Sequence, residues 1–173
     1  IFMVITIDGP AGVGKTTTSK RLASKLGYQY LDTGAMYRAV TYFLRKNSID
    51  ISSEVHVKKM LDILNLELDF TSEDEIKVLL DNVDISTLIR SKEITSAVSE
   101  VSAIKAVREK MVKIQKDTAK NGNFIVEGRD IGTVVFPDAK YKFFLTADYD
   151  VRAQRRLEDF KRVNEELNVN NCL

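Results

Sequence analysis

The chain has few of the residues that hold small secreted domains together or bind metal ions. Its 173 residues include one cysteine, one histidine, two prolines and no tryptophan. A single cysteine, Cys172, excludes an internal disulfide framework and fits a reducing compartment, so we expect a cytoplasmic protein. His56 has no histidine or cysteine near it in the sequence, which argues against a zinc site of the usual kind.

An excess of charge and long apolar runs are also missing. Lysine and arginine number 26 against 25 aspartate and glutamate, a formal net charge of +1, so any basic site must be a local cluster. No apolar run approaches the roughly 20 residues that span a bilayer, and no charged-then-apolar leader precedes the first expected strand. The net charge by itself argues neither for nor against nucleic acid. We expect a monomer with no nucleic-acid or membrane partner.

The most informative segment is a glycine-rich loop near the start of the chain. Residues 3–7 (MVITI) are apolar and β-branched, which predicts a buried strand, and apolar spacing predicts a helix over residues 16–26. Between them, residues 9–16 (GPAGVGKT) match G-x-x-x-x-G-K-[ST] at every fixed position. Backbone N–H groups of such a loop surround a phosphate, and the helix N-terminus adds positive charge. The segment indicates a nucleoside triphosphate site.

Two side chains of this loop have a direct chemical role in such a site. Lys15 would reach the β and γ phosphates, and the Thr16 hydroxyl can ligate Mg²⁺. Asp32 and Glu127 end strands that face the loop. Either carboxylate could hold Mg²⁺ through water, or it could merely cap a helix.

The rest of the chain alternates between expected strands and helices. The further strands are expected over residues 28–31, 124–126 and 142–145. The further helices are expected over 39–45, 55–64, 89–121 (as one helix or two) and 149–167. This alternation predicts a parallel, doubly wound α/β sheet. Ligands of such sheets bind at the carboxyl ends of the strands. The segments placed there are 8–16, 32–38, 127–133 and Asp148.

One region interrupts the alternation. Residues 66–70, 76–81 and 83–85 predict short antiparallel strands, with a polar turn at 72–75. We therefore expect a small β insertion beside the main sheet.

Four segments together resemble a bacterial cytidylate kinase (CMP/dCMP kinase). They are ITIDGPAGVGKTT (5–17), LDTGAMYR (31–38), IRSKEITSAVSEVSAIKAVR (89–108) and VEGRDIGTVVFPDA (126–139). The first segment alone fits many families, whereas LDTGAMYR and GRDIGTVVFPDA together fit few. The order and spacing hold to about residue 148.

The resemblance implies a P-loop NTPase-type three-layer α/β sandwich and a Mg²⁺-dependent kinase. ATP would be the co-substrate, and its γ-phosphoryl group would pass to CMP or dCMP. The chain would form one domain, residues 1–173, with a core of 1–64 and 90–173 and a monophosphate-binding β insertion at about 65–89.

The resemblance also implies the site residues. Those expected to hold the ATP phosphates are Gly9, Pro10, Ala11, Gly12, Val13, Gly14, Lys15, Thr16 and Thr17. Those expected at CMP are Thr33, Arg38 and Arg129 on the phosphate, Ser99, Arg108 and Asp130 on the cytosine edge, and Tyr37 as a binding or packing residue. Lys15, Arg38 and Arg129 would be catalytic. Their chemistry fits, because arginine suits planar phosphate contact and a carboxylate can accept from the cytosine amine.

Simpler interpretations stay open for several of these residues. Arg108 lies in a charged run with Lys105 and Glu109 that is typical of a solvated helix face, and Arg129 and Asp130 are adjacent and could pair locally. A third group, Arg152, Arg155 and Arg156, either pairs on the surface with Glu158 and Asp159 or forms a cationic face over the ATP phosphates.

The chain departs from the family after its arginine-rich helix. The family's arginine- and aspartate-rich lid, last strand and closing helix do not appear before Leu173. We therefore expect a truncated chain that is unstable or slow. Two further hypotheses are a paralogue that binds nucleotide with little turnover and a kinase of another nucleoside monophosphate or of a small hydroxy acid.

Overall fold

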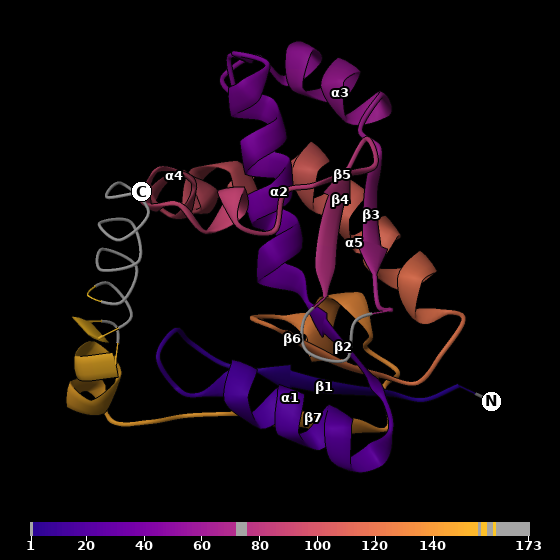
Figure 1. Ribbon diagram of the computed structural model, residues 1–173, viewed down its shortest axis with the longest axis vertical. Coiled ribbons are helices and arrows are strands. Elements are labelled where there is room, and N and C mark those ends of the chain that lie inside the picture. The colour runs from indigo at the N-terminus through magenta and orange to yellow at the C-terminus, as the bar shows by residue number, and fades with distance from the viewer. Residues whose placement is uncertain (1, 72–75, 156, 159–160, 162–173) are drawn as a thin grey trace.

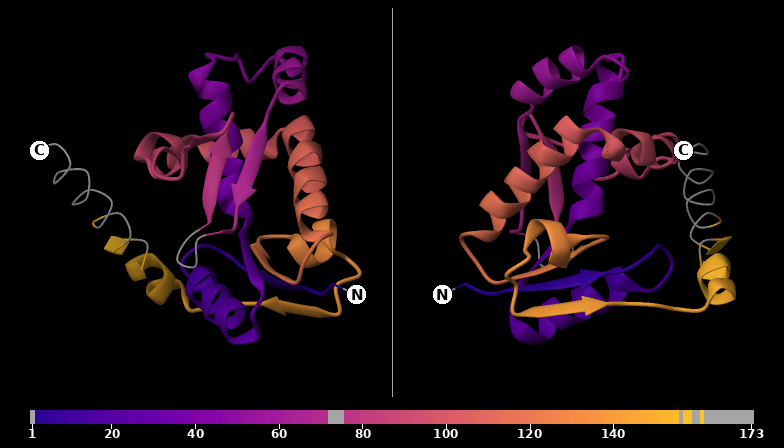
Figure 2. Two further views of the ribbon diagram at one scale, coloured as in Figure 1. Left: turned by 45° about the vertical axis from the view of Figure 1, so that its right-hand side comes forward. Right: turned by 180° about the vertical axis from the view of Figure 1, so that it is seen from behind.

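The computed structural model describes residues 2–71, 76–155, 157, 158 and 161. Within them the chain forms a parallel sheet with a helix on one face and a larger body of helices and a second, antiparallel sheet on the other (Figure 1). This confirms the predicted α/β fold with a small antiparallel sheet beside it. Figure 2 shows the same layers from two further directions.

Four strands form the parallel sheet. In chain order they are β1 (Val4–Asp8), β2 (Gln29–Asp32), β6 (Phe124–Gly128) and β7 (Tyr141–Phe144), and in space they are ordered β2-β6-β1-β7. The register pairs Asp8 with Gly128 and Asp32 with Glu127. The carboxyl ends of β1, β2 and β6 therefore lie at one level, as the sequence predicted for the ends of parallel strands.

Helix α1 (Lys15–Leu26) covers one face of the sheet, where Ile5, Ile7, Ala23 and Ile125 form a small buried core. Residues on the opposite face, such as Val126, join the main core beneath the larger body. Because side chains alternate along a strand, Ile125 and Glu127 share the α1 face of β6. This alternation aims the carboxylate of Glu127 at the start of α1.

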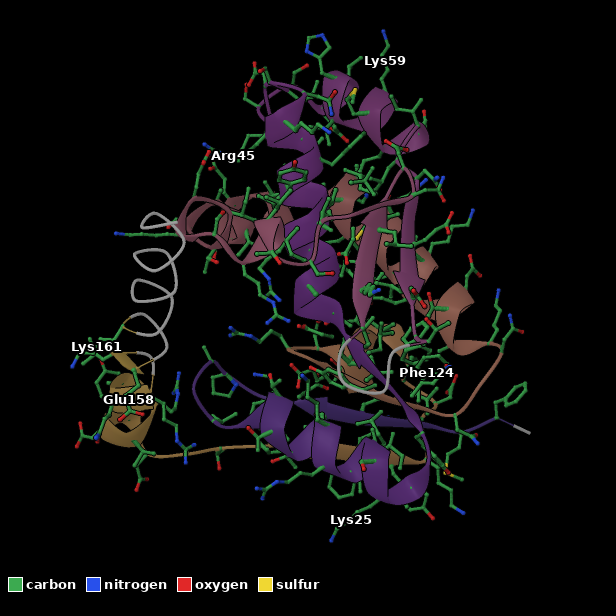
Figure 3. All side chains as sticks on the ribbon, in the orientation of Figure 1. Lys25, Arg45, Lys59, Phe124, Glu158 and Lys161 are labelled. Carbon is green, nitrogen blue, oxygen red and sulfur yellow. The ribbon has the colours of Figure 1, made fainter. Side chains whose placement is uncertain are left out.

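The larger body combines helices with the antiparallel sheet. Its elements are α2 (Thr33–Lys46), α3 (Glu54–Asp62), β3 (Leu66–Asp69), β4 (Lys77–Leu80), β5 (Val83–Asp84), η1 (Leu88–Arg90), α4 (Lys92–Ala103) and α5 (Lys105–Ala119). Completely buried Leu44 and Val107 belong to its core. Phe124, labelled in Figure 3, lies where the parallel sheet meets this body and packs edge-on against Phe70 at a ring-centre distance of 5.4 Å.

One helix differs from the prediction, and a second region matches one of two alternatives. We expected a helix to start at residue 39, but α2 starts at Thr33 because the Asp32 side chain accepts the Ala35 N–H at 3.0 Å and caps the first turn. The region 89–121 is divided, because Ile104 has extended backbone (φ −69°, ψ 122°) between α4 and α5. The sequence left one or two helices open there.

Some predictions fall partly outside the described residues. The polar turn at 72–75 lies outside them, and of the helix expected over 149–167 the residues 149–155 are helical. The boundaries proposed for the β insertion, about 65–89, stay a prediction. Within the described ranges, no helix is both long and apolar enough to cross a membrane.

Candidate active site

A cleft of about 790 Å³ opens at the carboxyl ends of the parallel strands, below α2 and α4. Residues predicted from the sequence line much of it: Ala11, Gly12, Lys15, Thr16, Asp32, Thr33, Tyr37, Arg38, Ser99, Arg108, Glu127, Arg129 and Asp130. The cleft therefore brings Lys15, Arg38 and Arg129 together. Of the predicted ATP-loop residues, Gly9, Pro10, Val13, Gly14 and Thr17 do not line it, and the loop presents Ala11 and Gly12 instead.

The glycine-rich loop has the backbone that its sequence predicts. Gly12 and Gly14 have φ of 79° and 91°, a region that favours glycine, and Gly14 is the N-cap of α1. Nζ of Lys15 donates to the Pro10 carbonyl at 2.9 Å, so the lysine is folded back over its own loop. Burial, and then the positive charge of Arg129, lower the pKa of Lys15. A phosphate would relieve that repulsion.

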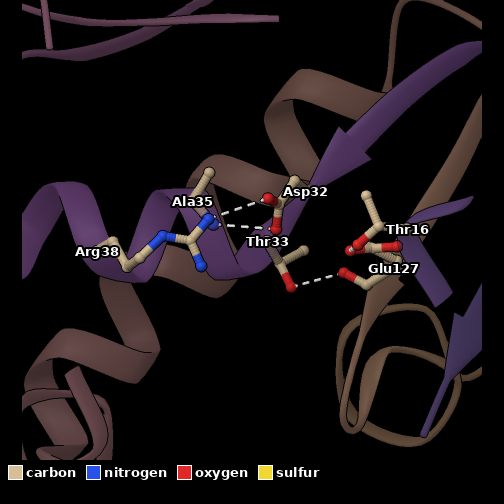
Figure 4. Close-up of polar contacts among 6 residues, drawn as sticks. All are labelled: Thr16, Asp32, Thr33, Ala35, Arg38 and Glu127. Atoms are coloured by element: carbon tan, nitrogen blue, oxygen red, sulfur yellow. Dashed lines mark hydrogen bonds and ion pairs between the residues drawn. The ribbon is translucent and has the colours of Figure 1, made fainter. Parts of the chain in front are cut away.

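Thr16 and Glu127 connect the loop to β6. The Thr16 hydroxyl donates to Oε1 of Glu127 at 2.9 Å, and Figure 4 labels both residues. Burial, and then the negative charge of Asp32, raise the pKa of Glu127. Its other oxygen, Oε2, is buried and has no hydrogen-bond partner in the described part of the chain.

These residues fit a magnesium ion that keeps most of its water. The described residues hold no group of three or more His, Cys, Asp or Glu side chains that could hold a metal. Mg²⁺ beside a nucleotide needs only one or two protein oxygens, because phosphates and water supply the rest. Thr16 offers a hydroxyl oxygen whose proton is already given to Glu127, and Glu127 offers a buried carboxylate.

Asp32 has two contacts, one for each oxygen. Oδ1 caps α2, and Oδ2 accepts from Arg38 NH2 at 3.1 Å (Figure 4). The contact supports the helix-cap alternative left open from the sequence. Nε of Arg38 is buried without a hydrogen-bond partner among the described residues, so the guanidinium keeps a donor available inside the cleft.

Thr33 ties α2 to the sheet. Its hydroxyl donates to the Glu127 carbonyl at 2.7 Å, and the residue is 3% exposed. The hydroxyl proton is therefore already used, and the phosphate contact predicted for this side chain would require it to leave that carbonyl. Its role at a phosphate stays a prediction.

The far end of the cleft holds an ion pair. Arg108 NH2 and Asp130 Oδ2 lie 2.5 Å apart, so Asp130 pairs across the fold with α5, in contrast to the local pairing with Arg129 left open above. Tyr37 lies close enough for both charges to act on its hydroxyl, whose pKa burial raises. Ser99 lines the same cleft from α4, and Arg129 is exposed. Arg108 thus lines the cleft, as the resemblance implied, and its contact with cytosine stays a prediction.

Asp8 supports this part of the site from below, which the sequence did not predict. Its Oδ1 accepts the Ile131 N–H and its Oδ2 the Gly132 N–H, both at 2.8 Å. These amides begin the short π-helix η2 (Ile131–Val135), directly after Asp130. Only its position at the end of β1 could have drawn attention to it.

Two arginines beyond β7 contact the glycine-rich loop. Nε of Arg152 donates to the Ala11 carbonyl at 3.1 Å, and NH1 of Arg155 donates to the Gly12 carbonyl at 3.2 Å. Both side chains therefore contact the loop, and a cationic face over the ATP phosphates stays a prediction. Arg156 and Asp159, named in the same hypothesis, lie outside the described residues.

The cleft is also lined by residues that the sequence did not single out, among them Lys20 and Tyr30. Arg90, which lies inside one of the resembling segments, lines it too. Lys20 lies four residues after Thr16 on α1, and this spacing places both residues on one face of the helix. The spacing could have identified Lys20 as a cleft residue from the sequence. His56, on α3, is exposed.

Comparison with known proteins agrees with this arrangement. The family model described as cytidylate kinase matches residues 5–173. A cytidylate kinase of Protochlamydia amoebophila is 47% identical over 99% of this chain and 76% of its own length. One of Fusobacterium nucleatum is 43% identical, with the same two shares. A bifunctional pantoate ligase/cytidylate kinase of Prochlorococcus marinus is 49% identical over 92% of this chain, which spans 31% of that longer protein.

Proposed function

Because the chain belongs to the cytidylate kinase family, we propose that it transfers the γ-phosphoryl group of ATP to CMP or dCMP, giving ADP and CDP or dCDP. One observation carries the proposal. A single cleft contains a triphosphate-binding loop at one end and the Arg108–Asp130 pair at the other. The cleft therefore has room and chemistry for two anionic nucleotides placed end to end.

At the ATP end, the protein supplies positive charge and backbone amides. Lys15 would exchange the Pro10 carbonyl for the β and γ phosphates, and the loop amides would surround them. Mg²⁺, when bound, would neutralise charge on the phosphates, held by Thr16 and through water by Glu127 or Asp32. Transfer needs alignment and charge neutralisation more than covalent help from the protein.

At the acceptor end, arginines would hold the monophosphate. Nε of Arg38 is a buried donor with no hydrogen-bond partner among the residues that the structure describes. Arg129 is exposed in the cleft, and its charge acts on Lys15. Asp130 would accept from the cytosine amine, and Arg108 and Ser99 would donate to the ring acceptors. A uracil carbonyl facing Asp130 would oppose two acceptors, which gives a reason for preferring cytosine.

Phosphorylation of a panel of acceptors tests the proposal directly. Purified protein is mixed with ATP, Mg²⁺ and CMP, dCMP, UMP or AMP, and ADP release is followed by a coupled assay. Turnover with CMP or dCMP is expected to be well above turnover with UMP or AMP. Turnover with none of the four, despite measurable ATP binding, favours the nucleotide-binding paralogue. A preference for UMP or AMP favours a kinase with another acceptor.

Lys15→Ala is the control for the loop. It should abolish turnover while circular dichroism stays that of the unaltered chain, because the Lys15 side chain makes one exchangeable contact with Pro10. Turnover retained by this variant would overturn the assignment of the ATP end. The monomeric state and the cytoplasmic location stay predictions.

A further inference from the structure

We propose that the Tyr30 hydroxyl donates to Oε2 of Glu127, which would fix the carboxylate that orients Thr16 and make Tyr30 a positioning residue for the ATP end of the cleft. The inference rests on the proposed function. It adds a residue outside the loop, on β2, to the group that prepares the cleft for magnesium and nucleotide.

The strand register brings these side chains to one place. Tyr30 pairs with Ile125 and Asp32 with Glu127 in the parallel ladder of β2 and β6. Tyr30 and Glu127 are therefore diagonal neighbours on the same face, the face covered by α1. Tyr30 packs against the small core that contains Ile125, and its side chain also lines the cleft.

Two buried atoms at this point lack partners, and their chemistry is complementary. The Tyr30 hydroxyl and Oε2 of Glu127 are both buried and have no hydrogen-bond partner within the described ranges. One is a donor and the other an acceptor of a carboxylate. Leaving a buried donor and a buried acceptor unpaired is unfavourable, so a bond between them is favoured.

The electrostatics place the hydroxyl in the same environment. Burial raises the pKa of Tyr30, and the negative charges of Asp32 and Glu127 raise it further. The tyrosine therefore stays a neutral donor. Glu127 then has both oxygens occupied, Oε1 by Thr16 and Oε2 by Tyr30.

The consequence reaches Thr16. A hydroxyl that gives its proton to Oε1 turns its lone pairs away from Glu127, toward the cleft. That orientation is the one a cation beside the phosphates needs. Outer partners that orient a metal-binding group typically contribute 10- to 100-fold to metal affinity. Tyr30 would act in this way through Glu127.

The test measures ATP binding with and without Mg²⁺, in the absence of any acceptor. Isothermal titration gives the Mg²⁺-dependent gain in ATP affinity for the unaltered chain and for Tyr30→Phe, which keeps the ring. The matched control is Tyr28→Phe, which removes a hydroxyl that donates only to Met3 Sδ at 3.5 Å. The gain should fall about 10-fold in Tyr30→Phe and stay unchanged in Tyr28→Phe, with magnesium-free affinity the same in all three.

A double variant separates positioning from packing. In a Glu127→Gln background, Tyr30→Phe should cause no further loss of the gain, because Tyr30 acts through that carboxylate. Four results would each overturn the inference. In the double variant, the loss of the Mg²⁺-dependent gain could be additive. In Tyr30→Phe, the gain could be unchanged, or ATP affinity could fall equally with and without Mg²⁺; in the unaltered chain, there could be no gain at all. If Tyr30→Phe disturbs folding, Tyr30→Met is a second variant without the hydroxyl, because a methionine side chain adapts to irregular space.

The two proposals can fail separately. An unaltered chain that binds ATP with Mg²⁺ but phosphorylates neither CMP nor dCMP overturns the proposed function, while the titrations still decide the role of Tyr30. A chain that phosphorylates CMP, with the same Mg²⁺ gain in Tyr30→Phe, overturns only the role of Tyr30.

Discussion

Asp8 offers a sharp test of how the fold supports the acceptor end of the cleft. The residue is 6% exposed, and its two oxygens each accept one backbone N–H of η2 at 2.8 Å. Asp8→Asn keeps the size but replaces one oxygen by an amino group, so one N–H loses its acceptor and faces another donor. A hydrogen bond to a charged group contributes about 1.5–3 kcal/mol, and an unpaired buried N–H costs about 1–3 kcal/mol. These terms overlap, and we expect a loss of about 2–4 kcal/mol in unfolding free energy.

Urea unfolding followed by circular dichroism measures this loss. With a denaturant slope of about 2 kcal/mol/M, the midpoint should fall by about 1–2 M. The KM for CMP should also rise severalfold, because η2 directly follows Asp130. The matched control is Asp50→Asn, whose exposed carboxylate accepts the Ser52 N–H at 3.0 Å outside the cleft. Midpoints that agree within about 0.3 M for Asp8→Asn and the unaltered chain would refute the reasoning.

Three further predictions concern the cleft and the core. Asp130→Ala should raise the KM for CMP far more than the KM for ATP and weaken the preference for CMP over UMP. Equal changes in the two KM values would contradict the cytosine-edge role. The control is Asp117→Ala, which breaks the 2.5 Å surface pair with Lys120. Gly12→Ala should weaken ATP binding measured by titration. A Cβ at residue 12 would lie 2.8 Å from the Arg152 carbonyl oxygen, and the φ of 79° costs alanine about 1–2 kcal/mol. Unchanged ATP affinity would show that the loop adapts. Leu44→Ala should lower the unfolding free energy by about 2–5 kcal/mol, because Leu44 is completely buried. In the control, Arg45→Ala, the exposed neighbour labelled in Figure 3 is removed, and the unfolding free energy should change by under about 1 kcal/mol. Similar losses in the two variants would argue against a core at Leu44.

The strand–loop–helix unit at the start of the chain could be predicted because its signals are local. β-Branched residues specify β1, and glycines are required where φ is positive in the loop. The alternation of strands and helices was sufficient to predict the α/β class and the common level of the strand ends. These features depend on short-range patterns that a sequence displays directly.

Features that depend on contacts between distant segments could not be predicted. The start of α2 was misplaced because Gly34 is typical of a loop, while the cap by Asp32 overrides that preference. Asp8 and η2 meet only after β1 and β6 pair. The bond from Thr33 to the Glu127 carbonyl joins residues 94 positions apart. Local propensity has no information on such pairs.

The end of β6 has a consequence for how the two substrates influence each other. Within four residues, Glu127 faces the loop that would hold ATP, while Arg129 and Asp130 face the acceptor end. A small shift of this one strand would therefore displace groups at both nucleotides simultaneously. A nucleotide that orders the end of β6 from one side should raise the affinity for the nucleotide on the other side. Positive cooperativity between donor and acceptor binding would then arise from backbone continuity alone.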